Sequence, residues 1–156
     1  TGLNKAETAR KYGEKQVLLW RRSFDERPPA LSKSDKTYVQ ILKAYPDVPK
    51  RFVPVSESLA DTYDRAVPFW EKKIVPDIKK CKRVLIVASH NSLRSLVKHI
   101  DKLSKRDIVE FTIPYGVPLV YEFDFSMRPK GHYYLGDAVQ IKETLSSMAA
   151  QGKAKK

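Results

Sequence analysis

The chain has 156 residues, of which 42% are hydrophobic and 31% are charged, so it is long enough for one globular domain with its own core. Its 30 lysines and arginines exceed its 18 aspartates and glutamates, and the resulting formal net charge of +12 favours anionic partners, which include phosphorylated metabolites, nucleic acid and anionic surfaces; a solvated basic surface is an equal alternative. The single cysteine, Cys81, excludes an internal disulfide framework and a metal site built on cysteine pairs. No apolar run approaches the ~18 residues that a membrane-spanning helix needs.

The first third of the chain is predicted to hold one helix and then a long irregular stretch. Residues 4–22 favour a helix, because Asn4 and Glu7 have the spacing of a capping box, although Gly13 weakens its middle. Residues 25–38 contain paired prolines among polar residues, and residues 41–56 contain three further prolines. Both stretches therefore predict loops.

A second helix is predicted over residues 56–80. Ser58 and Asp61 fit an N-terminal cap, and apolar residues recur every three or four positions from Leu59 to Ile78. Pro68 lies within this pattern and is expected to kink the helix, because proline removes a hydrogen-bond donor and clashes with the preceding turn.

Residues 83–88, RVLIVA, form a continuous apolar run without alternation, which is typical of a central parallel strand covered by helices on both faces. The remaining pattern predicts helices at 91–100, 104–111 and 137–152, and strands at 118–125 and 131–136.

This order of elements predicts an α/β fold with a mostly parallel sheet flanked by helices. Since only one strand is of the fully buried kind, further strands are expected from a segment preceding Thr1. Residues 1–150 are predicted to form a single domain, and residues 151–156 a flexible basic tail.

Ser89, His90 and Asn91 follow the predicted strand, where open α/β sheets bind their ligands. The next helix would begin there and would offer free backbone N–H groups to a phosphate or carboxylate. The same residues also have a purely structural interpretation, because Ser and Asn are common N-caps and a lone histidine is more often a hydrogen-bonded structural residue.

Three basic residues lie near the ends of the first predicted helix: Lys5 at its start, and Arg21 and Arg22 at its end. Paired arginines can hold a phosphate through charge-assisted hydrogen bonds. Cations at a helix C-terminus also simply complement the helix dipole, so this alternative stays open.

Six blocks of the sequence, which follow one another in order from one end of the chain to the other, resemble consecutive segments of cofactor-dependent phosphoglycerate mutase, a family of the histidine phosphatase superfamily. They are TGLNKAETARKYGEKQV, WRRSFD, ESLADTYDRAVPFWEKKIVPDI, KRVLIVASHNSLRSLVKH, PYGVPLVYEFD and AAQGKAKK. The resemblance is to the C-terminal three-fifths of such an enzyme, and it implies the corresponding part of the family's three-layer fold.

The resemblance implies an enzyme of glycolysis, in the cytoplasm, that interconverts 3-phosphoglycerate and 2-phosphoglycerate. The family works through a phosphohistidine primed by 2,3-bisphosphoglycerate and needs no metal. By the same resemblance, Lys5, Arg21 and Arg22 match basic substrate-binding positions, and Asn91 matches a residue whose main chain contacts the phosphate.

The chain departs from the family pattern at its catalytic positions. It contains no Arg-His-Gly-Glu motif, which carries the family's nucleophile, and it lacks the family's acidic proton-transfer residue. Ser89 aligns with the second catalytic histidine, and His90 aligns with a flexible glycine, so His90 is a candidate substrate-binding residue and a candidate substitute for that histidine. A displacement of one residue would turn its ring to the opposite face of a strand. Tyr115, at a position where the family has a small polar residue, is a further departure.

Two interpretations follow. In the first, the chain is part of a phosphoglycerate mutase that is inactive alone. In the second, it is a non-catalytic, mutase-like structural subunit of a larger or organellar assembly. Both predict that another segment or chain completes the sheet at residues 83–88, as a homo-oligomer or larger assembly, because exposed apolar strands invite pairing. Basic residues are scattered without a nucleic-acid motif, which argues against a nucleic-acid partner.

Overall fold

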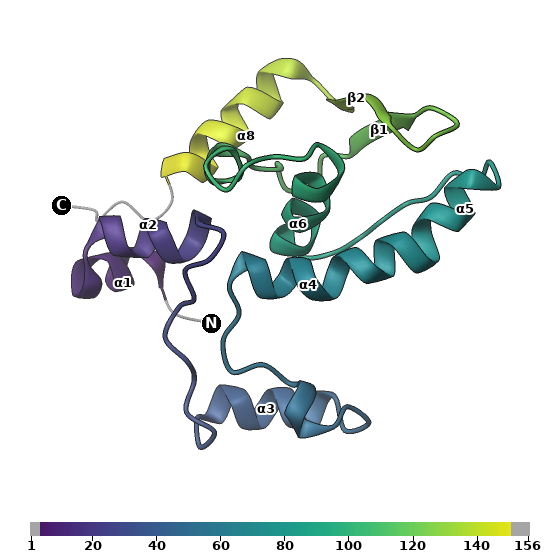
Figure 1. The fold of residues 1–156 in the computed structure, drawn as a ribbon. Helices are drawn as coiled ribbons and strands as arrows, with labels where there is room; N and C mark the ends of the chain where they lie inside the picture. Colours follow the sequence, from purple (N-terminus) through teal and green to yellow (C-terminus); the bar gives the residue numbers. More distant parts are fainter. Residues whose placement is uncertain (1–3, 151–156) are drawn as a thin grey trace.

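The computed structural model describes residues 4–150, and helices make up most of its regular structure (Figure 1). The predicted tail at residues 151–156 lies outside the described residues. The elements in chain order are α1 (Lys5–Tyr12), α2 (Glu14–Arg22), α3 (Lys36–Ala44), the 3₁₀ helix η1 (Lys50–Phe52), α4 (Leu59–Phe69), the π-helical η2 (Trp70–Ile74), α5 (Val75–Lys79), α6 (His90–Ile100), α7 (Asp107–Glu110), β1 (Leu119–Phe123), β2 (Pro129–Tyr134) and α8 (Ala138–Ala150).

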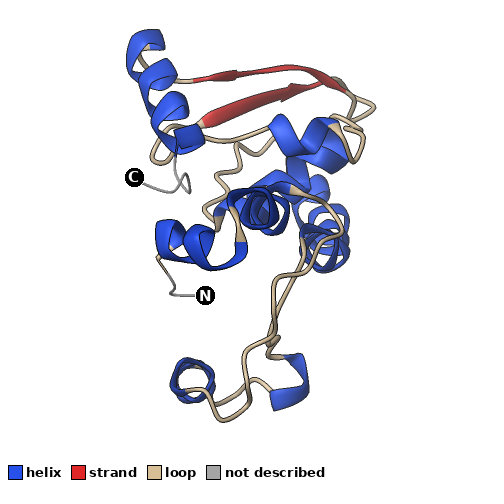
Figure 2. Ribbon diagram, turned by 90° about the vertical axis from the view of Figure 1, so that its left-hand side faces the viewer, coloured by secondary structure: helices blue, strands red, loops and turns tan. Residues whose placement is uncertain are grey.

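The predicted α/β fold with a mostly parallel sheet is wrong. Within residues 4–150 the only sheet is an antiparallel pair of strands, β1 and β2, in which Leu119 lies opposite Tyr134. The two strands predicted at residues 118–125 and 131–136 are thereby confirmed, and they form a hairpin. Figure 2 shows these two strands on one side of the helices, so the described chain has no central sheet with helices on both faces.

The predicted strand at residues 83–88 is also wrong. The segment makes no backbone hydrogen bond to any other described residue, and no strand pairs with it in that part of the chain. Leu85 and Val87 are 82% and 86% exposed, whereas Ile86 packs against the core. A continuous apolar run indicates that a segment needs cover on both faces, but a strand exists only where a neighbouring backbone hydrogen-bonds to it.

The predicted helix at residues 4–22 is divided into α1 and α2. The Asn4 side chain caps α1 by accepting hydrogen bonds from the N–H groups of Ala6 and Glu7, at 2.9 and 3.2 Å. Gly13 then adopts a φ of 86°, which few other residues tolerate, and ends α1 one residue before α2 begins. The cap is therefore confirmed, and a single continuous helix is not.

The second predicted helix is confirmed with its cap. Ser58 and Asp61 form a reciprocal capping box, in which the Ser58 N–H donates to the Asp61 carboxylate at 2.7 Å and the Asp61 N–H donates to Ser58 Oγ at 3.2 Å. Pro68 lies inside α4, and Pro76 lies in the first turn of α5. Neither proline can donate to the preceding turn, and the chain passes between them through the π-helical turn of η2.

The loop prediction is wrong for residues 36–44, which form α3. Asp35 caps this helix by accepting a hydrogen bond from the Thr37 N–H at 2.7 Å. Figures 1 and 2 show α3 and η1 set apart from the other helices, at the end of two loop segments that run side by side. A hydrogen bond of 3.0 Å from the Leu31 N–H to the Val55 carbonyl joins those two segments.

The core lies where α4 and η2 pack against α6. Trp70, Ile74 and Leu96 form its buried centre, and Ile86 and Phe123 pack against them. The contact through Ile86 holds the segment before α6, while that through Phe123 holds the hairpin. The core therefore fixes where α6 begins.

The later helices lie where they are predicted, although α7 is shorter than the predicted helix at 104–111. The Asp107 N–H donates to Ser104 Oγ at 3.1 Å just before α7, but the N-cap of this helix is Arg106, whose side chain makes no capping bond. The Asp137 carboxylate accepts from the Gln140 N–H at 2.9 Å at the start of α8. In residues 4–150 no helix is both long and apolar enough to cross a bilayer.

Candidate anion-binding site

The first turn of α6 offers backbone donors at the end of the extended segment. Ser89 is its N-cap, and its carbonyl accepts the first helical hydrogen bond, from the Leu93 N–H at 3.0 Å. The Ser89 hydroxyl lies 3.0 Å from that of Ser92 and does not cap the helix. The N–H groups of the first turn therefore have no helical acceptor and suit an anion.

The His90 imidazole is held by the segment that follows α7. Its Nε2 lies 3.0 Å from the Thr112 hydroxyl and 3.3 Å from the Ile113 nitrogen. Because a backbone N–H can only donate, Nε2 must be the acceptor, and the ring is then neutral with its proton on Nδ1. The Nε2 lone pair is thus already engaged within the protein.

Four cationic side chains lie close enough to this ring to repel a positive charge on it. The pKa of His90 falls to about 4, mainly because the ring is buried, and then because Arg94, Arg22, Arg21 and Lys5 oppose a further positive charge. The pKa of Lys5 is lowered for the same reasons, by burial first and then by the two arginines of α2. Residues 85 positions apart in sequence are therefore electrostatic neighbours.

Arg94 is fully buried, and its guanidinium donors are engaged by acceptors within the protein. Its Nε donates to the Phe111 carbonyl at 3.1 Å, and its Nη2 donates to the carbonyls of Arg22, at 3.0 Å, and Ile108. Nη1 lies 3.4 Å from Asn91 Oδ1. Burial, and then repulsion from Arg22, lowers the Arg94 pKa to about 10. Arg94 is therefore a positioning residue that ties α6 to the end of α2.

The sequence prediction assigned no role to Arg94. A signal was available, because Arg94 lies three residues before Val97 and so shares the apolar face of an amphipathic helix. A cation on such a face must find several acceptors when it is buried.

The Arg22 guanidinium lacks one hydrogen-bond acceptor among the described residues. Its Nη1 is buried and makes no hydrogen bond within residues 4–150. Arg21 is half-buried beside it, and its pKa is lowered by burial and then by Arg22. A buried guanidinium nitrogen without an acceptor costs free energy, which an anion would recover.

The predicted substrate-binding residues thus come together from three places in the chain. Lys5, Arg21 and Arg22 lie close enough to His90 to affect its pKa, and Asn91 lies in the exposed first turn of α6 beside Arg94. Ser89, the aligned position of the second catalytic histidine, is exposed.

In the described part of the chain, no three His, Cys, Asp or Glu side chains are grouped so that they could hold a metal ion. The arrangement at His90 is instead a set of cationic and backbone donors, which can bind an anion. A scan of protein-family models finds none that matches the chain.

Proposed function

We propose that the cluster of Lys5, Arg21 and Arg22 with the first turn of α6 binds the phosphate of a phosphorylated three-carbon acid. The observation that carries this proposal is the buried Arg22 Nη1, which has no acceptor within residues 4–150. A phosphate oxygen would accept from this nitrogen, and the free N–H groups in the first turn of α6 suit the same kind of ligand.

Electrostatics supports the same ligand. Lys5 and Arg21 each have a lowered pKa, partly because neighbouring positive charges repel them. A dianionic phosphate would remove this repulsion, and the gain is larger for the half-buried Arg21 than for the exposed Lys5, which water screens well. A neutral ligand would leave it in place.

With the resemblance to phosphoglycerate mutase, the proposed whole activity is interconversion of 3-phosphoglycerate and 2-phosphoglycerate in cytoplasmic glycolysis, primed by 2,3-bisphosphoglycerate. In that mechanism a histidine takes the phosphoryl group and returns it to the other hydroxyl, while cations hold the oxygens. This chain supplies the cations. It contains no Arg-His-Gly-Glu segment to supply the nucleophile.

His90 is a poor substitute for a catalytic histidine. Its Nε2 already accepts from the Ile113 N–H and lies 3.0 Å from Thr112 Oγ1, so attack on phosphorus would first break both contacts. Its low pKa, about 4, also makes it a weak base at neutral pH. The chain alone is therefore expected to bind phosphate esters without transferring phosphoryl groups.

Isothermal titration calorimetry with 2,3-bisphosphoglycerate tests the binding site. We expect Arg22→Gln to weaken binding by about tenfold or more, since it removes a charge and a forked donor. Arg10→Gln, an exposed arginine in the last turn of α1, is the matched control and should bind as the unaltered chain does. Equal affinity in all three proteins would reject the site.

A turnover assay tests the proposed lack of catalysis. The chain is incubated with 3-phosphoglycerate and catalytic 2,3-bisphosphoglycerate, and 2-phosphoglycerate is measured. We expect no product above the blank. Product that increases in proportion to the chain would show that a side chain within it accepts the phosphoryl group.

A second candidate function is a non-catalytic, mutase-like subunit of a larger assembly. The observation that favours it is the exposure of Leu85 and Val87 in a segment whose backbone makes no hydrogen bond among the described residues. We propose that another segment or chain pairs with residues 83–88 under either function. Retained phosphate binding without turnover, together with stable association through this segment, would favour the structural role.

A further inference from the structure

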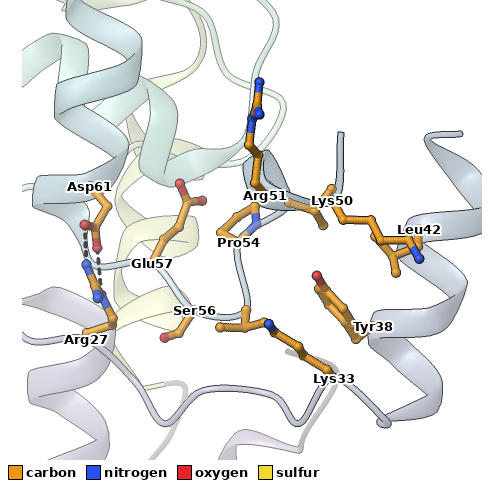
Figure 3. A pocket seen from close by; sticks show the side chains of 12 residues that line it. Arg27, Lys33, Tyr38, Leu42, Lys50, Arg51, Pro54, Ser56, Glu57 and Asp61 are labelled. Atoms are coloured by element: carbon orange, nitrogen blue, oxygen red, sulfur yellow. Dashed lines mark hydrogen bonds and ion pairs between the residues drawn. The ribbon is translucent and has the colours of Figure 1, made fainter. Parts of the chain in front are cut away.

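An open cavity lies outside the cluster around His90. It has a volume of about 730 Å³ and is lined by α3, the loop segment that contains Arg27 and Lys33, and residues 50–57 (Figure 3). That volume is within the range of cavities that bind small molecules. It shares no lining residue with the cluster of Lys5, Arg21, Arg22 and His90.

Tyr38 presents an unpartnered hydroxyl to this cavity. The residue lies in the first turn of α3 and is only 4% exposed, so its ring is part of the cavity wall. Its hydroxyl points toward the middle of the cavity in Figure 3 and makes no hydrogen bond to any described residue. Among the described residues only Arg22 Nη1 is a buried side-chain nitrogen or oxygen without a partner, so the Tyr38 hydroxyl oxygen is open to the cavity and is available to a ligand there.

The acidic side chains of the lining are already neutralised. Asp61 accepts two hydrogen bonds from Arg27, one of them 3.0 Å long, and Glu57 accepts two from Arg65, at 2.7 and 3.1 Å. The Arg27 guanidinium is therefore engaged by Asp61 and is not available to a ligand.

Two lysines of the lining are left without an acidic partner. Lys33 and Lys50 make no ion pair within residues 4–150. Figure 3 shows the Lys33 side chain reaching toward the middle of the cavity and Lys50 extending along it toward Leu42. Arg51 points away, with its guanidinium over the Phe52 ring at 4.9 Å. The cavity therefore carries two uncompensated positive charges.

The remaining wall is apolar. It consists of Leu42 from α3 together with Val53, Pro54 and Val55 from the segment that follows η1. This wall offers contact to a hydrocarbon or aromatic group. Lys33 and the Tyr38 hydroxyl offer donors toward the middle of the cavity, and Lys50 offers one beside Leu42. The two parts favour a ligand that is anionic at one end and apolar at the other.

We propose that this cavity binds a phosphate monoester with an apolar body. The phosphate lies between Lys33 and Lys50, whose two charges match its own, Tyr38 donates to a phosphate oxygen, and the apolar body lies against Val53 and Val55. Lysine suits phosphate as a point charge, and no arginine fork is free here for bidentate binding of a carboxylate.

Titration of the full chain with phenyl phosphate tests this site, with inorganic phosphate and benzoate as comparison ligands. We expect phenyl phosphate to bind at least about tenfold more tightly than either, because only it supplies both the dianion and the ring. Backbone amide chemical shifts should change for residues 36–44 and 50–57. No saturation by phenyl phosphate up to about 10 mM would overturn the proposal.

Variants of the lining residues test whether phenyl phosphate binds in this cavity. Lys33→Gln with Lys50→Gln should weaken phenyl phosphate binding about tenfold or more, and Tyr38→Phe, which keeps the ring and its packing, about threefold. Lys43→Gln is the control, because Lys43 is exposed on α3 and does not line the cavity. Binding that is lost in Arg22→Gln and unchanged in the double lysine variant would assign the ligand to the other cluster and overturn this proposal, leaving the proposed function intact.

Discussion

The Arg94 guanidinium donates a hydrogen bond of 3.0 Å to the main-chain carbonyl of Arg22, across 72 positions of sequence. Through this contact a fully buried cation on α6 holds the end of α2, where Arg21 and Arg22 lie. The geometry of the proposed phosphate site therefore depends on a residue that does not itself face the ligand.

Replacement of Arg94 should reduce both stability and phosphate binding. Arg94→Met leaves the carbonyls of Arg22, Ile108 and Phe111 without their donor, and we expect a loss of about 3 kcal/mol in the free energy of unfolding. Chemical denaturation measures this loss, and calorimetry with 2,3-bisphosphoglycerate measures binding in the protein that remains folded. Arg10→Gln should change stability by less than about 0.5 kcal/mol. A comparable loss in both variants would contradict the proposed role of Arg94.

His90 should make stability dependent on pH between about 6.5 and 4. Its native pKa is about 4, below the ordinary histidine value of 6.5. In this range the His90 ring is therefore protonated in the unfolded chain and neutral in the native protein. The free energy of unfolding is therefore highest, as far as His90 is concerned, above pH 6.5, and it decreases as the pH falls toward 4. Because the ring is partly exposed and salt screens the surrounding cations, we expect about 1–2 kcal/mol from this group.

Titration of the His90 ring protons by nuclear magnetic resonance tests the native pKa directly. A midpoint near 4 is expected in the absence of phosphate. Addition of 2,3-bisphosphoglycerate should raise the midpoint, since an anion offsets the repulsion from Arg22 and Lys5. A midpoint near 6.5 without ligand would contradict the described cluster.

Leu85 and Val87 should respond to substitution differently from Ile86, which lies between them in the extended segment. Leu85→Lys and Val87→Lys place charges on side chains that are already exposed, and we expect changes below about 0.5 kcal/mol in stability but weaker association with any partner. Ile86→Ala removes a side chain from the core and should cost about 1–2 kcal/mol.

Sedimentation and chemical denaturation distinguish these outcomes. The unaltered chain is expected to self-associate or to bind its partner through residues 83–88, and the double lysine variant is expected to lose this property at unchanged stability. If Leu85→Lys destabilised the isolated chain as much as Ile86→Ala, the segment would not have one exposed and one packed face.

The Tyr121 hydroxyl should contribute to the attachment of the hairpin to α6. It donates to Asp101 Oδ2 at 2.7 Å, and His132 Nδ1 lies 3.2 Å from the same oxygen. Burial, with the hydrogen bond to Asp101, raises the Tyr121 pKa, so the hydroxyl stays protonated and remains a donor. Tyr121→Phe should lower the free energy of unfolding by about 1–2 kcal/mol, because Asp101 loses its shortest partner.

Tyr133→Phe is the matched control, since Tyr133 lies in the other strand of the hairpin and is 51% exposed. It should change stability by less than about 0.5 kcal/mol, as measured by chemical denaturation. Similar losses in the two variants would indicate that the Asp101 contact does not hold the hairpin.

Local signals in the sequence predicted the ends of several helices. Asn4, Ser58 and Asp137 were recognisable as caps because each side chain bonds to backbone only two or three residues away. The signal for α3 was of the same kind, with Asp35 capping at Thr37, but the loop prediction was based on the nearby prolines and did not use it. The predicted basic site residues were also recognisable as charge beside a helix end.

The sequence by itself determined where helices begin, which residues are apolar, and that cations lie at both ends of the first helical region, because these depend on contacts within one turn. Only the tertiary structure decided that residues 83–88 remain unpaired, that His90 is engaged by Thr112 and Ile113, and that Arg94 holds Arg22. A strand needs a second backbone, and a buried cation needs acceptors from elsewhere in the chain. The sequence of one segment does not specify which distant backbone will pair with it or which distant acceptors will surround its cation.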